Sequence, residues 1–443
     1  MTTYWQKEIE CMPREEIEKL QLKRTKGMLK RAYDRIAWFK KQYDAHGVKP
    51  EDFKELDDLS KFPLVQKDDL RDNYPFGLFA EPMENVIRIH ASSGTTGKPI
   101  LGGYTKHDVY DVFAEVNARS LNCCDVTSQD IIQNAYGYGL FTGGLGIHYG
   151  GEMIGATVIP ISGGNTARQL MLMEDFGSTA ITCTPSYMIY LAEEINKRGI
   201  NRENIKLKVG IHGAEPWSEK MRKKIEELMP GMTAIDIYGL TEIIGPGVSV
   251  NCTVNRYKGL HIWEDHFLPE ILDPKNDFER VAPGEKGEIA FSTITREATP
   301  LPRYRAKDIT RLNYEKCACG RTHARHDKIT GRTDDMLIIH GINVFPSQIE
   351  SVLMDIPQLA GYYEIVVDRK DLGSLDKVTI RIELTEEHFS DKVKDIEAFT
   401  KEVADKLYSS LLFHAKIELV PPGTIPRSVG KAQRVVDMRA DKI

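Results

Sequence analysis

Two different patterns of apolar residues divide the chain. Between residues 14 and 48, apolar positions recur at three- and four-residue steps, which predicts helices. From about residue 86, short β-rich runs alternate with helical patterns at 166–175, 186–198 and 217–229. This alternation predicts a parallel-rich sheet with covering helices, in which ligand-binding loops follow the carboxyl ends of the strands.

The pattern changes again near Gly331. The later residues predict a compact α+β unit whose elements are a strand at 336–339, a helix at 346–354, strands at 362–368 and 376–384, a helix at 391–411 and a strand at 415–420. We therefore expect an α/β protein. Its expected parts are a helical segment at 1–85, packed on a large domain with parallel-rich sheets at 86–332, and a small mobile α+β domain at 333–443.

Composition narrows the class of protein. The 443 residues carry a formal net charge of −6, so no basic excess is available for a broad nucleic-acid surface. No apolar run approaches the length of a membrane span, and the opening MTTYWQKEIE lacks the apolar core of a signal peptide. Seven cysteines in so long a chain do not suggest a secreted disulfide framework. A reducing cytoplasm is the expected location.

The most informative local sequence is SSGTTGKP, residues 92–99, directly after the β-rich VIRIHA. Its small hydroxyl residues and glycines let backbone N–H groups approach an anion closely, although such a loop can also be a plain turn. It is not a P-loop, because Pro99 follows the lysine. A second glycine-rich run, GGLGIHYGG at 143–151, is better explained by turns or close packing than by a nucleotide site.

A second motif, DIYGLTE at 236–242, ends another β-rich run. Glu242 is a candidate ligand for Mg²⁺ bound to ATP, since magnesium prefers oxygen ligands shared with phosphate. A surface carboxylate at a turn is the alternative. The later segments YRAKD (304–308), GRTDD (331–335) and SVGKA (428–432) are weak when taken singly.

The order of these segments is far more specific than any one of them. SSGTTGKP, GAEP (213–216), YGLTE, YRAKD, GRTDD and a late GK together resemble the adenylate-forming enzyme superfamily. Within it, GLHIWEDHF (259–267), NVFPSQIE (343–350) and GKAQRV (430–435) resemble the phenylacetate–CoA ligase branch. The resemblance implies that ATP and Mg²⁺ activate a carboxylic acid as an acyl-adenylate, that coenzyme A accepts the acyl group, and that the enzyme is a homodimer.

The resemblance also implies a role for each matching position. The β- and γ-phosphates of ATP would lie against Ser92, Ser93, Gly94, Thr95, Thr96, Gly97 and Lys98. The adenine and acyl side would be lined by Gly213, Ala214, Glu215 and Pro216, with Asp236, Ile237, Tyr238 and Gly239 beside the base. Thr241 would touch the α-phosphate and Glu242 would hold Mg²⁺. Asp308, assisted by Arg332, would accept hydrogen bonds from the ribose hydroxyls.

Lys431 is the expected catalytic lysine. The resemblance implies that it bridges the acyl carboxylate and the α-phosphate, where a cation stabilises charge in the transition state. The small domain would then rotate about a hinge at Asp334 and remove the lysine, so that the thiol can attack. The sequence departs from the branch at His340, a position that is usually arginine.

Two further sites are expected. QNAYGYGLFTGG (133–144) falls at the acid-binding wall, where Tyr136, Tyr138 and Phe141, with Gly137 and Ala214, would surround an aromatic acid; a buried strand is the alternative. Cys252, His261, Cys317 and Cys319 form a candidate structural zinc set, with unbonded reduced cysteines as the alternative. His266, His323 and His326 compete for the histidine position.

Three other functions stay open at this point. The acyl group could be loaded onto a carrier protein, the acid could be non-aromatic, or the chain could be a nucleotide-binding regulatory protein without catalysis. The presence of Glu242, Asp308, Arg332 and Lys431 argues against the last of these.

Overall fold

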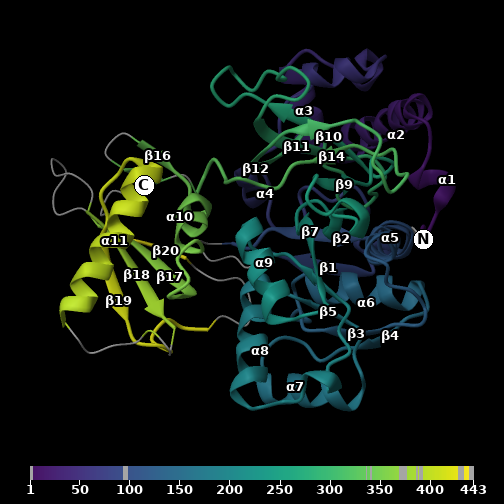
Figure 1. Ribbon diagram of the computed structural model, residues 1–443. Helices are drawn as coiled ribbons and strands as arrows, with labels where there is room; N and C mark the ends of the chain where they lie inside the picture. Colours follow the sequence, from purple (N-terminus) through teal and green to yellow (C-terminus); the bar gives the residue numbers. More distant parts are fainter. Residues whose placement is uncertain are drawn as a thin grey trace. The chain divides into compact units, whose positions relative to one another are not determined.

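The computed structural model describes residues 3–92, 98–335, 337–339, 342–368, 377–385, 388, 393–427 and 434–438. They form two compact units (Figure 1). The first unit comprises residues 1–183, 198–214 and 231–328, and the second comprises residues 184–197, 215–230 and 329–443. The second unit thus contains two stretches that the chain supplies before residue 231. The predicted domain boundary at 332/333 stays a prediction.

Helices open the first unit, where the periodicity predicts them. They are α1 (Lys7–Glu10), α2 (Arg14–Arg35), α3 (Ala37–Ala45) and α4 (Lys67–Asp72), with short 3₁₀ turns at Pro50–Asp52, Leu56–Lys61 and Met83–Asn85. Helix α2 buries one stripe, in which Ile17, Met28, Leu29 and Ala32 are spaced as an amphipathic helix requires. Residues of this stripe belong to the same hydrophobic core as the sheets, so the segment is part of the first unit.

A nine-stranded sheet is the centre of the first unit, in the order β13-β14-β9-β8-β7-β6-β5-β3-β4. Its predicted parallel part holds β4 (Thr157–Ile159), β3 (Ile131–Asn134), β5 (Ala180–Cys183), β6 (Val209–His212) and β7 (Thr233–Leu240). The antiparallel continuation, which the sequence did not indicate, holds β8 (Gly245–Val250), β9 (Leu260–Ile262), β14 (Arg325–His326) and β13 (Leu312–Asn313). The helices between the parallel strands are α6 (Gly143–Met153), α7 (Thr166–Asp175), α8 (Pro185–Lys197) and α9 (Glu219–Leu228), and a π-helix (Asp108–Ala114) continues into α5 (Glu115–Cys123) before them.

Two smaller antiparallel sheets complete this unit. VIRIHA does not join the parallel sheet: β1 (Arg88–Ala91) pairs only with β2 (Leu101–Tyr104) among the described strands. The other sheet is β10 (Phe267–Leu272), β11 (Gly287–Thr293) and β12 (Tyr304–Thr310). YRAKD therefore begins a strand, and its alternating burial places Asp308 on the buried face.

Close packing explains the glycine-rich run GGLGIHYGG, which forms helix α6. A Cβ at Gly144 would lie 2.6 Å from the carbonyl oxygen of Gly137, and one at Gly150 would lie 2.6 Å from the Cβ of Asn117. Real side chains do not approach so closely, so these positions accept only glycine where α6 meets its neighbours. The packing interpretation is confirmed.

The α+β unit predicted after Gly331 forms the body of the second unit. Its elements are β15 (Leu337–Ile339), β16 (Ile342–Val344), α10 (Pro346–Leu353), β17 (Leu359–Asp368), β18 (Lys377–Leu384), α11 (Val393–Leu411), β19 (Lys416–Val420) and β20 (Val435–Asp437). Strands β19-β18-β17-β20 form one sheet. The short strands β16 and β20 were not predicted, because three residues carry too little periodicity to be recognised.

Helices α8 and α9 belong to this second unit and are hydrogen-bonded to its C-terminal part. The ammonium of Lys224 in α9 donates to the carbonyls of Leu359 and Ala360, both at 3.3 Å, and the backbone N–H of Ser218 donates to Glu350 at 3.1 Å. Among the helices of the described residues, none combines the length and apolar character that crossing a membrane requires.

Candidate active site

The end of β7 carries the DIYGLTE motif. Asp236, Ile237, Tyr238 and Gly239 lie in the strand, and Thr241 and Glu242 follow it. A Cβ at Gly239 would lie 1.8 Å from the carbonyl oxygen of Gly245, so β7 and β8 can meet here only if this residue is glycine. The chain turns tightly at this point and leaves Glu242 at the carboxyl end of a parallel strand, where ligands bind in such sheets.

Tyr238 connects two sheets through Asp308. Its hydroxyl donates to the Oδ2 of Asp308 at 2.6 Å, and Asp308 is almost fully buried on β12. The ring of His326, on β14, packs edge-on against Tyr238 with centroids 5.2 Å apart. The Nε2 of His326 lies 2.6 Å from the hydroxyl of Ser249. Burial lowers the pKa of His326, so the ring stays neutral at pH 7. The structure therefore brings together two residues that the sequence predicts for the nucleotide site, although they are seventy positions apart.

Glu242 is held by its backbone as well as by its side chain. The guanidinium of Arg296 donates through Nη1 to the carbonyls of Glu242 at 2.7 Å and Ile243 at 2.8 Å. Its Nη2 donates to the carbonyl of Gly103 at 3.1 Å, and the group lies 4.7 Å from the ring centroid of Tyr104. This buried arginine fixes the path of the chain just after β7. The Glu242 carboxylate lies 3.9 Å from the ammonium of Lys67.

A buried histidine, His90, lies beside Tyr104, the residue on which Arg296 packs. His90 lies on β1, its Nδ1–H donates to the carbonyl of Leu140 at 3.0 Å, and its ring stacks edge-on against Tyr104. Burial lowers the pKa of His90 to about 4, with a smaller effect from the charges of Arg88 and Arg296. The imidazole is therefore neutral at physiological pH.

The SSGTTGKP loop connects β1 and β2. Ser92 closes its base, because the backbone N–H of Ser92 donates to the carbonyl of Ile100 at 2.9 Å and its hydroxyl accepts from the N–H of Ile100 at 3.1 Å. Lys98 is exposed, with its ammonium 5.4 Å from the ring centroid of Tyr74. Residues 93–97, which include Ser93, Gly94, Thr95, Thr96 and Gly97, lie outside the described residues.

The GAEP motif is divided between the two units. Gly213 and Ala214 follow β6 in the first unit, and Ala214 has a φ of +70°. Such a left-handed conformation is uncommon for alanine and is typical of functional turns. Glu215 and Pro216 belong to the second unit, where the carboxylate of Glu215 accepts from the N–H of Ser186 at 2.8 Å.

The predicted hinge lies in the second unit. Arg332 donates to Asp334 at 3.0 Å, which pairs a predicted ribose-site residue with the predicted hinge residue. Lys431 and His340 lie outside the described residues.

The predicted acyl wall is a loop rather than a strand, because β3 ends at Asn134. The Tyr136 hydroxyl donates to the carbonyl of Cys183 at 2.9 Å, and the Asn134 amide donates to the Tyr138 hydroxyl at 2.7 Å. Burial raises the pKa of Tyr138 to about 12. Phe141 is half exposed. The buried-strand alternative is wrong here. The loop leaves Tyr136 in contact with strand β5 and Tyr138 in contact with His148 of helix α6.

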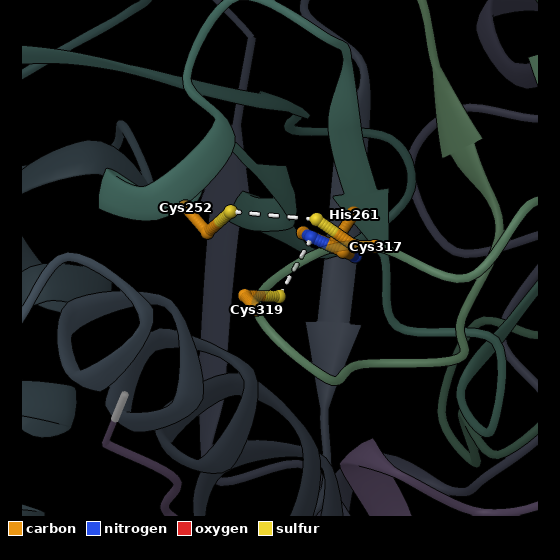
Figure 2. Close-up of side chains that lie close together, drawn as sticks. All are labelled: Cys252, His261, Cys317 and Cys319. Carbon is orange, nitrogen blue, oxygen red and sulfur yellow. Dashed lines mark hydrogen bonds between the residues drawn. The ribbon is translucent and has the colours of Figure 1, made fainter. Parts of the chain in front are cut away.

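Three cysteines and one histidine converge on a single point in the first unit. Figure 2 shows Cys252, His261, Cys317 and Cys319 with their polar atoms pointing toward one another. All four residues are buried, and their ligand atoms lie within 4.8 Å of one another. The Sγ atoms of Cys252 and Cys317 are 3.8 Å apart, and the Sγ of Cys319 lies 3.5 Å from the Nε2 of His261. A sulfur separation of 3.8 Å is far too long for a disulfide.

The competing histidines face other partners. His323 contacts the backbone of Glu264 and Ile9, while His266 contacts Thr295 and lies between two carboxylates. His326 is the histidine that packs on Tyr238. His261 is therefore the one that the structure places with the cysteines, because β9 pairs with both β8 and β14 and carries it into the cluster.

Residues near the N-terminus contact the loop that carries Cys317 and Cys319. The Tyr4 hydroxyl donates to the carbonyl of Cys319 at 2.5 Å. Arg321 and Glu10 form an ion pair at 2.7 Å in which neither side chain is exposed to solvent. Tyr4 and Glu10 are thereby tied to a loop more than three hundred positions away.

Comparison with known proteins decides the family. Residues 18–295 match the model of the AMP-binding enzyme family, and residues 341–439 match that of the AMP-binding enzyme C-terminal domain. A phenylacetate-coenzyme A ligase of Thermus thermophilus is 49% identical over 448 residues, which cover 98% of this chain and 99% of that protein. The Escherichia coli protein of the same name is 48% identical over 432 residues, covering 97% of each. The chain belongs to the phenylacetate–CoA ligase branch of the AMP-binding enzyme family.

Solved structures agree with this membership. A crystal structure of 2-hydroxyisobutyryl-CoA ligase in its postadenylation state superposes with a TM-score of 0.91 at 28% identity, covering 98% of this chain and 92% of that one. The chain is therefore an enzyme, an AMP-forming acid–thiol ligase that uses ATP and coenzyme A. The α/β fold expected for an AMP-binding enzyme, with a large sheet domain and a smaller C-terminal domain, is confirmed.

Several residues that contact the motifs of this AMP-binding enzyme were not predicted from the sequence. They are Lys67, His90, Tyr104, Ser249, Arg296 and Lys328, the last lying 3.6 Å from Asp236. None of them stands in a recognisable motif. Arg296 could have been found only through its burial, since its hydrogen bonds go to backbone carbonyls whose positions the sequence does not reveal.

Proposed function

We propose that this ligase activates phenylacetic acid or a closely related arylacetic acid. The observation that carries the proposal is the near full-length similarity to two ligases named for phenylacetate, at 48 and 49% identity. The aromatic loop at 136–141 supports it, since flat rings beside Gly137 suit an aromatic acid. A homodimer in a reducing cytoplasm is part of the same proposal.

The proposed reaction has two steps. In the first, an oxygen of the acid's carboxylate attacks the α-phosphorus of ATP, a P–O bond forms, and pyrophosphate leaves. Lys431 offsets the charge of the two anions, Glu242 ligates Mg²⁺, and Asp308 accepts hydrogen bonds from the ribose. In the second, the thiolate of coenzyme A attacks the acyl carbon, a thioester forms, and AMP leaves.

ATP–pyrophosphate exchange with a panel of acids tests the substrate. We expect phenylacetate to exceed benzoate, 2-hydroxyisobutyrate and octanoate. A clear preference for octanoate would refute the aromatic proposal while leaving the ligase chemistry intact. Glu242→Gln tests the metal ligand and should abolish exchange; an unchanged Mg²⁺ dependence in this variant would reject the assigned role of the carboxylate.

We also propose that Cys252, His261, Cys317 and Cys319 hold a structural Zn²⁺. A tetrahedral zinc with Zn–S bonds of about 2.3 Å and a Zn–N bond of about 2.0 Å separates two sulfurs by about 3.8 Å, and a sulfur from a nitrogen by about 3.5 Å. The distances of 3.8 Å between Cys252 and Cys317 and 3.5 Å between Cys319 and His261 fit these values. Burial lowers the pKa of His261 and keeps it in the neutral form that binds metals.

Elemental analysis of the purified protein tests the zinc proposal. About one zinc ion per chain is expected in the natural protein, and Cys317→Ser should lose it. Cys11→Ser is the matched control, because Cys11 is only partly buried and lies outside the cluster. Natural protein without zinc, or Cys317→Ser that retains it, would contradict the assignment.

A further inference from the structure

A fully buried amide, that of Asn134, stands at the carboxyl end of β3, where the proposed acid-binding loop begins. Its Nδ2 donates to the hydroxyl of Tyr138 and to the carbonyl of Gly144, both at 2.7 Å. Its Oδ1 accepts from the hydroxyl of Thr182 at 2.9 Å and from the backbone N–H of Tyr136 at 3.4 Å. Two donated and two accepted bonds are all that an asparagine side chain offers, so its capacity is used in full.

These partners permit only one orientation of the amide. The carbonyl of Gly144 can only accept, and the backbone N–H of Tyr136 can only donate. Turning the amide over would exchange Nδ2 and Oδ1, and would leave both of these groups facing an atom of their own kind. Asn134 therefore holds the backbone of Tyr136 and the hydroxyl of Tyr138 in one fixed relation to each other.

The contact with Tyr138 continues as a chain of hydrogen bonds into helix α6. The Tyr138 hydroxyl lies 3.2 Å from the Nδ1 of His148, whose Nε2 lies 3.1 Å from the carboxylate of Glu152. Because a carboxylate only accepts, that Nε2 carries a proton, and in the neutral ring Nδ1 accepts from the Tyr138 hydroxyl. The two rings meet edge-on with centroids 5.7 Å apart. The oxygen of Tyr138 thus accepts from Asn134 while its proton is donated to His148.

The ring of Tyr136 is held at both ends. Its backbone N–H donates to Asn134, and its hydroxyl donates to the carbonyl of Cys183 on β5, the strand beside β3, at 2.9 Å. Ser162 joins the two parts of the loop, because its N–H donates to the carbonyl of Asn134 at 3.1 Å and its hydroxyl accepts from the N–H of Tyr138 at 3.4 Å. Both rings of the proposed acid-binding wall therefore depend on Asn134.

Packing of the sheet alone does not require this amide. The backbone of β3 already pairs with β4 and β5, and an apolar side chain at its end could pack against the neighbouring strands. A buried polar network in which every member is paired rigidifies its members and specifies one arrangement of them. Here the members include the two rings on which the proposed acid-binding wall depends.

We propose that Asn134 is a positioning residue for the acid: it holds Tyr136 and Tyr138 in the arrangement that receives an aromatic ring, and thereby sets the preference for aromatic over linear acids. The proposal rests on the acid-binding role proposed above for the loop at 136–141. Asn134 acts only through the two tyrosines, since its four hydrogen bonds leave no donor or acceptor for a ligand.

Asn134→Ala tests the proposal in ATP–pyrophosphate exchange, with kcat and KM measured for phenylacetate, octanoate and ATP. The KM for phenylacetate should rise about tenfold, because two hydrogen bonds to the loop are lost, while the KM for ATP stays within about twofold. The KM for octanoate should change less, so the preference for phenylacetate shrinks. A purely structural role would reduce the amount of active enzyme, which lowers kcat for both acids equally and moves neither KM.

Gln133→Ala is the matched control. Gln133 precedes Asn134 in β3 and is equally buried, but successive side chains of a strand point to opposite faces of its sheet. Its Nε2 donates to the side chain of Gln169 at 2.6 Å, and its Oε1 accepts from the hydroxyl of Ser178 at 2.9 Å. The same replacement thus removes a buried amide that does not bond to Tyr136 or Tyr138, and both KM values should stay natural.

Tyr138→Phe removes one of the hydrogen bonds from the partner's side and keeps the ring, so it provides the test if Asn134→Ala does not fold. It should raise the KM for phenylacetate about threefold. The double variant should raise this KM by less than the product of the two single effects, because both changes remove one shared contact. An unchanged KM for phenylacetate in Asn134→Ala or in Tyr138→Phe, or an equal rise in Gln133→Ala, would overturn the role of Asn134.

The acid preference of the natural protein separates this proposal from the one beneath it. If the natural protein prefers octanoate, the aromatic substrate proposed above fails first. If the natural protein prefers phenylacetate and Asn134→Ala keeps both its KM and its preference, only the role of Asn134 fails.

Discussion

Replacing Arg296 with lysine should slow adenylation without unfolding the enzyme. The guanidinium donates to three backbone carbonyls, two of them in the segment that begins at Glu242. Lysine keeps the charge but offers one nitrogen where arginine offers two at this site. At least one of these charged hydrogen bonds is therefore lost, at a cost of about 1.5–3 kcal/mol.

The lost hydrogen bond should shift Glu242 itself, because its own carbonyl is one of the three acceptors. If the whole of this cost opposes the arrangement that binds Mg²⁺, the adenylation rate drops by about 10- to 150-fold. ATP–pyrophosphate exchange over a range of Mg²⁺ concentrations measures both the rate and the metal requirement, which should rise. Thermal unfolding reports on the fold.

Arg311→Lys is the control for this experiment. Arg311 pairs with Asp327 and is half exposed in the same unit, so its replacement should change neither quantity. An Arg296→Lys enzyme with natural exchange rate and natural Mg²⁺ requirement would show that the backbone contacts do not position Glu242.

Three further predictions concern the first unit. Glu10→Ala should lower the free energy of unfolding in urea by about 3–5 kcal/mol, because it leaves Arg321 buried without its carboxylate. The double change Glu10→Leu with Arg321→Met should recover most of this stability. A small loss of stability in the single variant would contradict this prediction. His90, whose folded pKa of about 4 lies below its ordinary 6.5, binds more protons when unfolded, so stability should fall as pH drops from 6.5 toward 4. Between pH 7.5 and 5 the free energy of unfolding should fall by about 2 kcal/mol through His90, and His90→Phe should lack this part of the fall. If stability falls equally steeply with pH in the natural protein and in His90→Phe, His90 is not its source. Tyr238→Phe removes a hydrogen-bond donor to Asp308 and should raise the KM for ATP about tenfold in the exchange assay. An unchanged KM would show that this hydrogen bond does not contribute to nucleotide binding.

Local periodicity predicted the elements whose pattern is long enough to read. Helix α7 has its predicted bounds, and α8, α9, β17 and β18 lie within three residues of theirs, because each element repeats its apolar spacing several times. Strands β9, β13 and β14 have only two or three residues and depend on pairing with distant partners. The antiparallel half of the large sheet therefore could not be predicted.

Part of the candidate site could likewise be predicted from the sequence, and part could not. Motif residues such as Glu242 and Asp308 could be named from the sequence, since their spacing carries the family resemblance. The hydrogen bond between Tyr238 and Asp308 could not, because it joins strands of two different sheets. The four residues of the cysteine–histidine cluster could be listed as candidates, but their meeting depends on the pairing of β9 with β14. Arg296 had no signal at all in the sequence.

The burial of Glu10 against Arg321 also constrains how the enzyme is made. Glu10 is translated about three hundred residues before its partner, and at roughly 5–20 residues per second the wait is about 15–60 s. During that time the Tyr4–Glu10 segment has no site to occupy, since the loop that receives it ends at residues 319–322. The contacts of Tyr4 and Glu10 with this loop can therefore form only after nearly three-quarters of the chain has left the ribosome.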